Sequence, residues 1–247
     1  MKCELCSYTV DACHTAARLG IDRVELCASP AEGGVTPSMG TIAEVCSSVD
    51  IETSVMIRPR GGDFLYSDKE FDVMLRDIRI AHDMGCTGVV FGILTADGKV
   101  DIKRTRLLVE AAHGMDTTFH RAIDMTQDYL QAIEDVISTG CTRILTSGGH
   151  DKAIDGIVNI SQAVSLASHR IEIMAGSGVS TDNVHILAAT GVDALHFSAK
   201  KSIPSKMLYH NPHISMGGSS SIDEYALRVV DEEEVSKIRR LVREHSR

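Results

Sequence analysis

The sequence predicts an α/β protein that folds as a single TIM-type (β/α)8 barrel. Short apolar runs alternate with amphipathic stretches of helical period, which is typical of βα units around a parallel sheet. Eight such units fit within 247 residues, a usual length for this barrel. The glycine-rich turn that follows the first strand of open dinucleotide-binding sheets is missing, because Cys6-Ser7-Tyr8-Thr9 stands there. We therefore expect one barrel domain over residues 1–247.

Each predicted strand is a short, mostly apolar run. In chain order the strands are expected at 2–6, 23–27, 53–58, 88–93, 117–120, 143–146, 171–175 and 194–197. Segments of helical period separate them, for example 67–84 and 181–189. A helix-stopping glycine precedes several of the strands, at Gly20, Gly85, Gly140 and Gly191. The recurrence of this stop indicates one repeated unit.

The segment 200–231 has no clear strand or helix period and is longer than a plain connection in a compact barrel. We expect a lid-like loop there, followed by a C-terminal helix at 232–245. Four residues in this loop carry soft donor atoms, although such residues in a polar loop more often pack or face solvent. They are Met207, His210, His213 and Met216.

Composition and charge exclude several classes of function. The net charge is -9 and no run of Lys or Arg is long enough to follow a phosphate backbone, so we expect no nucleic-acid partner. No apolar stretch approaches the roughly 20 residues that cross a bilayer, and the first residues lack the apolar core of a signal peptide. We therefore expect no membrane partner and a cytoplasmic location. Seven cysteines, an odd number, favour reduced thiols over a disulfide framework.

The tripeptide Glu-Leu-Cys occurs twice, at Glu4-Leu5-Cys6 and 21 residues later at Glu25-Leu26-Cys27. On a strand, Glu and Cys of each copy point to one face and Leu to the other. If that face looks into the barrel, both thiols meet on neighbouring strands about 5 Å apart and offer a soft-metal site. The alternative is that both cysteines only pack in the core, where cysteine is common.

Two arginines follow the third predicted strand. Arg58 and Arg60 share a face, and buried arginines usually need an anionic partner. Glu4 or Glu25 would supply that partner in a purely structural ion-pair network. If the arginines are unpaired, they would instead bind a phosphate or carboxylate ligand. We expect Arg58 to be mainly structural and Arg60 mainly ligand-facing.

Other polar residues lie at the ends of later strands, where barrel active sites are built. His120 ends the fifth strand and is a candidate general acid or base, or a metal ligand. Gly176, Gly178 and Ser198 follow the seventh and eighth strands, as in the phosphate sites of many barrels. His196 shares the face of Ser198, and we slightly favour a core histidine there over a functional one.

Several long strings carry a family resemblance that covers nearly the whole chain. They are Arg23-Val24-Glu25-Leu26-Cys27, Glu32-Gly33-Gly34-Val35-Thr36-Pro37-Ser38, Ile57-Arg58-Pro59-Arg60-Gly61-Gly62-Asp63-Phe64, Thr118-Phe119-His120-Arg121-Ala122, Leu145-Thr146-Ser147-Gly148, and Met216-Gly217 followed by Asp223-Glu224-Tyr225. The chain resembles the CutC family, named for copper homeostasis. The resemblance implies a TIM-type barrel, a cytoplasmic protein, often a homo-oligomer, and Cu(I) bound by Cys6 and Cys27. Cys3 and His210 depart from the family pattern, where an apolar residue and an arginine are usual.

Two functions follow. The first is copper homeostasis, with Cu(I) held by Cys6 and Cys27. The alternative is a barrel enzyme of unknown reaction that acts on a small anionic or phosphorylated metabolite. In that enzyme Arg58 and Arg60 would clamp charge and His120 would act as acid or base, while Gly176, Gly178 and Ser198 would bind phosphate.

Overall fold

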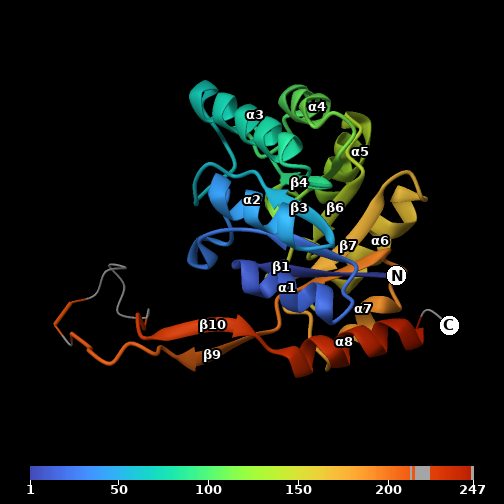
Figure 1. Ribbon diagram of the computed structural model, residues 1–247. Coiled ribbons are helices and arrows are strands. Elements are labelled where there is room, and N and C mark those ends of the chain that lie inside the picture. Colours follow the sequence, from blue (N-terminus) through green and yellow to red (C-terminus); the bar gives the residue numbers. More distant parts are fainter. Residues whose placement is uncertain (212, 215–222, 246–247) are drawn as a thin grey trace.

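A closed barrel of eight parallel strands forms the body of the protein, as the sequence predicts (Figure 1). The computed structural model describes residues 1–211, 213–214 and 223–245. The barrel strands are β1 (Lys2–Ser7), β2 (Arg23–Leu26), β3 (Glu52–Met56), β4 (Gly88–Phe91), β5 (Asp116–Phe119), β6 (Arg143–Thr146), β7 (Glu172–Gly176) and β8 (Ala194–Phe197). They pair in chain order, and β8 closes the barrel against β1.

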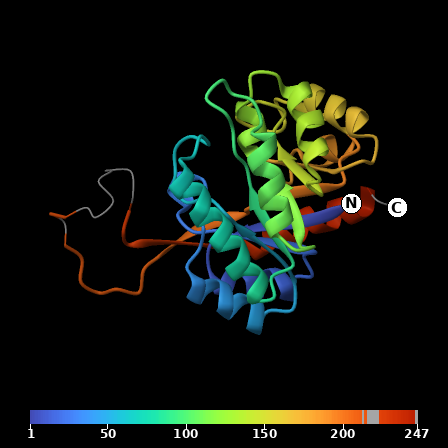
Figure 2. The same cartoon turned by 90° about the horizontal axis from the view of Figure 1, so that it is seen from above.

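Helices surround the barrel on its outside (Figures 1 and 2). They are α1 (Val10–Arg18), α2 (Met39–Ser48), α3 (Asp68–Asp83), α4 (Ile102–Ala111), α5 (Tyr129–Thr139), α6 (Ile157–Ala167), α7 (Val184–Ala188) and α8 (Glu232–His245), with short 3₁₀ turns η1 (Pro30–Glu32) and η2 (Arg121–Met125). Among the described residues, no helix combines the length and apolarity that crossing a bilayer requires.

Local sequence explains the agreement at α3 and the difference at α7. Ser67 caps α3, and its hydroxyl accepts from the Glu70 N–H while the Glu70 carboxylate accepts from Ser67. The predicted segment 67–84 therefore matches the helix and its two caps. The segment predicted at 181–189 is helical only over Val184–Ala188. Asn183 accepts a hydrogen bond from the Ser180 N–H at 3.0 Å, which holds the preceding residues in a turn.

A layer of charged side chains fills the barrel where its strands begin. Arg23 and Arg143, only 1% and 2% exposed, both point into the barrel. Arg23 donates to Glu4 and, at 3.2 Å, to Glu172. Arg143 donates to Asp116 at 3.2 Å and lies 2.7 Å from the same Glu172. These mutual partners keep charges in a space that barrels usually fill with Val, Ile and Leu.

The segment 200–231 differs from the expected irregular loop. It contains an antiparallel hairpin of β9 (Lys200–Pro204) and β10 (Ala226–Val230), which extends away from the barrel (Figures 1 and 2). In the segment between β9 and β10, the His210 ring stacks on the Tyr225 ring with centroids 3.8 Å apart. Met216, one of the four soft donors predicted here, lies outside the described residues. The helix predicted at 232–245 is confirmed as α8.

Candidate metal centre at the barrel mouth

The two Glu-Leu-Cys copies lie on neighbouring strands with their Glu and Cys side chains turned into the barrel, as alternation predicts. Their register, however, places Cys6 opposite Glu25 and not opposite Cys27. Closure of a barrel requires neighbouring strands to be staggered, and the stagger between β1 and β2 offsets the two copies by one inward position. Cys27 therefore lies one inward position further toward the carboxyl ends of the strands than Cys6, and the two side chains still hydrogen-bond to each other.

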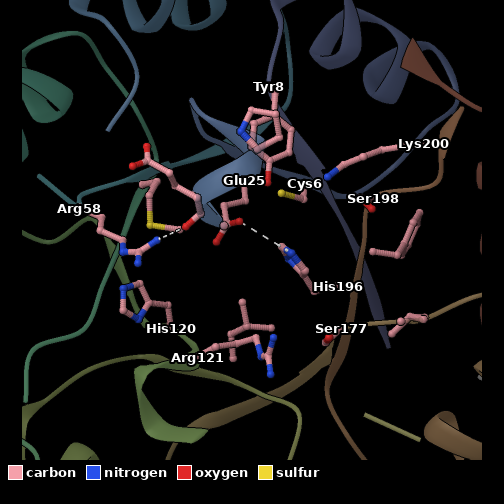
Figure 3. A pocket seen from close by; sticks show the side chains of 18 of the residues that line it. Cys6, Tyr8, Glu25, Arg58, His120, Arg121, Ser177, His196, Ser198 and Lys200 are labelled. Atoms are coloured by element: carbon pink, nitrogen blue, oxygen red, sulfur yellow. Dashed lines mark hydrogen bonds and ion pairs between the residues drawn. The ribbon is translucent and has the colours of Figure 1, made fainter. Parts of the chain in front are cut away.

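Three inward side chains meet at this level of the barrel. Potential ligand atoms of Cys6, Glu25 and His196 all lie within 4.8 Å of one another. Figure 3 shows the three side chains converging, with His196 contributed by β8. The register explains this meeting, because β1 pairs with β2 on one side and β8 on the other. His196, expected from the sequence to be a core histidine, belongs to the cluster.

Cys27, which directly follows the last residue of β2, packs against this cluster. Its sulfur donates to Oε2 of Glu25 at 3.4 Å, and it packs with Cys6, Met56 and Val90. Cys6 lines the mouth cavity, whereas Cys27 is 1% exposed and lies behind it. The two thiols thus belong to one small buried group, with two apolar side chains as its wall.

Burial and mutual charges set the ionisation of this group. A hydrogen bond with Cys27 and the nearby His196 hold the pKa of Cys6 well below its ordinary value, although burial opposes this. Burial also opposes protonation of His196, but Glu25, Cys6 and Glu4 outweigh it and raise the pKa of His196. Burial, with the charges of Cys6 and Glu4, raises the pKa of Glu25 to about 8. The mutual charges of the site therefore favour the thiolate form of Cys6 and the imidazolium form of His196.

The predicted pairing of the two strand-end arginines with Glu4 or Glu25 is wrong. Arg58 donates to the carbonyl oxygens of Glu32, Gly34 and Gly62 at 2.6, 2.9 and 2.7 Å. Loop carbonyls are partners that no sequence pattern reveals. Arg58 still lines the cavity, on the side opposite His196 (Figure 3).

Arg60 has a different position. It pairs with Glu70 at 2.7 Å and with Asp63 at 2.9 Å, and its side chain is 37% exposed. Arg60 is not among the residues that line the mouth cavity. The expectation that Arg60 faces a ligand stays an untested prediction, and the observed ion pairs brace the loop after β3.

His120 lies across the cavity from the cysteine cluster (Figure 3). Its Nδ1 accepts a hydrogen bond from the Ala122 N–H at 3.1 Å, so the ring proton resides on Nε2. Nε2 is buried and has no partner among the described residues. Burial and the charge of Arg58 lower the pKa of His120 to about 3. A neutral His120 can therefore donate a hydrogen bond from Nε2 into the cavity but is a weak base.

The cavity at the mouth has a volume of about 490 Å³. Gly178 and Ser198, two of the three residues predicted as an anion site, line it together with Ser177, Arg121 and Lys200. Lys200 lies 4.4 Å from the centre of the Tyr8 ring and has no carboxylate partner among the described residues. The third predicted residue, Gly176, instead faces the barrel interior, where a Cβ would lie 2.6 Å from Leu145.

Sequence reasoning missed Tyr8 and Lys200 and gave too little weight to His196. Tyr8 and Lys200 follow the ends of β1 and β8, so the strand-end rule extends to them. His196 could be found from parity, since it lies two residues from Ser198 and registers with Glu4. That register is a property of the closed barrel and is not written in the local sequence.

Comparison with known proteins points to one family. The CutC family model matches residues 1–201. A family protein CutC of Enterobacter sp. (strain 638) is 44% identical over 242 residues, covering 98% of each chain. The human copper homeostasis protein cutC homolog is 43% identical over 239 residues, covering 96% of this chain and 86% of the human protein.

Solved structures agree. The crystal structure of CutC from Streptococcus agalactiae has a TM-score of 0.75 and 36% identity, covering 79% of this chain and 97% of that one. A thiamine phosphate pyrophosphorylase from Pyrococcus furiosus has a TM-score of 0.60 at 13% identity, a likeness of barrel fold alone. With the family model, close relatives and fold in agreement, the chain belongs to the CutC family, whose members include copper homeostasis proteins.

Proposed function

We propose that the protein serves copper homeostasis by binding Cu(I) at the barrel mouth through Cys6 and Cys27. The observation that carries the proposal is the packing of Cys6 with a second thiol, Cys27, in one buried group, where their hydrogen bond and the nearby His196 lower the pKa of Cys6. Thiolates are the soft ligands that Cu(I) prefers, and a thiol with a lowered pKa gives up its proton to binding more readily. Cys6 faces the cavity and would meet the ion first.

His196 is the third donor in this proposal. Its Nδ1 lies 2.8 Å from Oε1 of Glu4, and its Nε2 lies 3.7 Å from Oε2 of Glu25. A carboxylate on one ring nitrogen is the usual support for a histidine that binds metal through the other. Glu4 would thus hold the Nδ1 proton, while the cation would displace the Nε2 proton, which would be released to solvent.

The residues around this group fit a cation. Oε1 of Glu25 is buried without a hydrogen-bond partner among the described residues, which is costly unless something positive approaches it. Cys27 donates to the other oxygen of Glu25, which ties this carboxyl group to the two thiols. Met56 and Val90 exclude water from the sulfur atoms and so favour a low coordination number.

An anaerobic competition with a chromophoric Cu(I) chelator tests the proposal. Cys6→Ser and Cys27→Ser should each weaken Cu(I) binding at least about tenfold, whereas Cys3→Ser should leave it unchanged. Cys3 is the matched control, because it is a buried thiol on β1 that belongs to the core outside the barrel. Equal losses in all three variants would mean adventitious thiol binding and would end the proposal.

A second candidate function rests on the size of the cavity. A volume of about 490 Å³ is far more than one ion needs and suits a small metabolite. Lys200, without a carboxylate partner among the described residues, and the hydroxyls of Ser177 and Ser198 would favour an anion. His120 would donate from Nε2. This is the reading of the chain as an enzyme of unknown reaction on an anionic or phosphorylated substrate.

Thermal melting with inorganic phosphate or pyrophosphate separates this candidate from the first. Binding to the folded state should raise the melting temperature of the native protein, and Lys200→Ala should abolish the increase. Lys201→Ala is the matched control, since Lys201 neighbours Lys200 on β9 and does not line the cavity. No shift in the native protein, or the same shift in both variants, would argue against an anion site.

Family membership also leads us to propose a cytoplasmic homo-oligomer. Light scattering after size exclusion tests the assembly, and fractionation of cells tests the location.

A further inference from the structure

Two thiols far from the mouth lie in contact with each other. Sγ of Cys46, in the last turn of α2, is 2.6 Å from Sγ of Cys86, in the turn between α3 and β4. The adjacent Thr87 N–H donates to the Thr53 carbonyl, which places this turn where β3 begins. The pair therefore lies at the end of the barrel opposite the mouth.

The separation of the sulfur atoms fits a covalent bond better than a shared metal. With metal–sulfur bonds of about 2.3 Å in a tetrahedral site, two thiolates would stand roughly 3.7 Å apart. A disulfide holds its sulfur atoms about 2.05 Å apart, and little movement from the observed contact is needed to reach it. Among the described residues, no third metal-binding side chain joins this pair.

The two thiols are chemically unequal. Cys46 is half-buried, whereas Cys86 is 6% exposed. A hydrogen bond from Cys86 lowers the pKa of Cys46, and the same contact together with burial raises the pKa of Cys86. Cys46 is thus the more accessible and the more nucleophilic of the two.

We propose that Cys46 and Cys86 form a peroxide-sensitive dithiol that closes into a disulfide. The Cys46 thiolate attacks one oxygen of a hydroperoxide, so that an S–O bond forms, the O–O bond breaks and hydroxide leaves. The Cys86 sulfur then attacks the sulfur of the sulfenic acid, forming the S–S bond and releasing water. With hydrogen peroxide, two thiols lose two electrons and two protons in all, and the peroxide is reduced to two molecules of water.

The disulfide would tie α2 to the entry of β4. It would close a loop that spans 40 positions in sequence and includes β3, α3 and the Arg58 loop. A cross-link over such a span restricts the unfolded chain strongly, and we expect the melting temperature to rise by about 5–10 °C.

The chain offers a matched control thiol. Cys141 stands in Gly140-Cys141-Thr142 before β6, the equivalent of Gly85-Cys86-Thr87 before β4. It is similarly buried at 5% exposed, but its sulfur accepts from the Thr139 hydroxyl at 3.4 Å and contacts no cysteine within the described part of the chain.

Peptide mapping after treatment with a small excess of hydrogen peroxide tests the proposal. Free thiols are blocked with N-ethylmaleimide before digestion without reductant. We expect the Cys46 and Cys86 peptides to be joined and the free thiols to fall by two from seven. Cys141→Ser should behave identically, whereas Cys86→Ser should lose the cross-link and the rise in melting temperature.

Two results would overturn the proposal. One is full blocking of all seven thiols after peroxide treatment. The other is a cross-link between different cysteines, such as Cys6 and Cys27. If Cys86→Ser does not fold, Cys46→Ala replaces it, because Cys46 is only half-buried and its truncation removes less packing.

Discussion

Nδ1 of His196 on β8 lies 2.8 Å from Oε1 of Glu4 on β1, across the seam where the barrel closes. The carboxylate fixes the orientation of the imidazole and leaves Nε2 directed toward Glu25 and Cys6. One residue of the charged layer thereby supports one residue of the proposed metal centre.

We predict that His196→Ala weakens Cu(I) binding by at least about tenfold, because the third donor is lost. Anaerobic chelator competition measures the change. His120→Ala is the control, since His120 is another buried histidine of the mouth but lies outside the cluster. An equal loss in both variants would contradict the assignment of His196.

We predict that Glu4 makes stability depend on pH below neutrality. Although burial opposes ionisation, His196 and Arg23 lower the pKa of Glu4 to about 2, against 4.5 for an unperturbed glutamate. Its stabilising contribution is complete above the unfolded pKa and is lost as pH falls toward the folded pKa. Between pH 7 and pH 3 the native protein should lose about 2 kcal/mol through this group.

Urea unfolding of Glu4→Gln beside the native protein isolates that contribution. At pH 7 the variant should be about 3–5 kcal/mol less stable, because Arg23 is left without its buried partner. The difference should shrink as the pH approaches 3. A difference that stays constant over this range would rule out ionised Glu4 as the source.

We predict unequal losses of stability for the two strand-end arginines. Arg58→Ala removes buried hydrogen bonds to loop carbonyls and should cost about 2–4 kcal/mol. Arg60→Ala removes half-exposed ion pairs and should cost about 0.5–1 kcal/mol. Chemical denaturation compares them, and a larger loss for Arg60→Ala would reverse the assignment.

We predict that Arg143→Met destabilises the protein by about 1–3 kcal/mol without changing Cu(I) affinity. The substitution removes the cation between Asp116 and Glu172, far from the mouth, but Asp116 is half-exposed and Glu172 keeps its ion pair with Arg23. Unfolding and chelator competition on the same sample separate the two effects. Weakened Cu(I) binding in a folded variant would show that the charged layer and the metal centre are coupled.

The sequence predicts the barrel and the inward faces of Cys6 and Cys27, because both follow from period and alternation. It does not predict that Cys6 faces Glu25, since the stagger of β1 and β2 depends on closing the whole barrel. The partners of Arg58 escape prediction because they are loop carbonyls. The β9–β10 hairpin escapes it because the residues of β9 are exposed on both faces, which erases the apolar alternation.

The charged layer blocks passage through the barrel interior. It consists of Arg23, Glu4, Glu172 and Arg143. Its arginines are almost wholly buried, so the barrel is plugged beneath Cys6 and is not a tunnel. An ion that reaches Cys6 through the barrel mouth must therefore also leave through the mouth. Handing over such a cargo would require the recipient to approach the rim from which Lys200 and the β9–β10 hairpin extend, which makes that rim the place to look for an exchange partner.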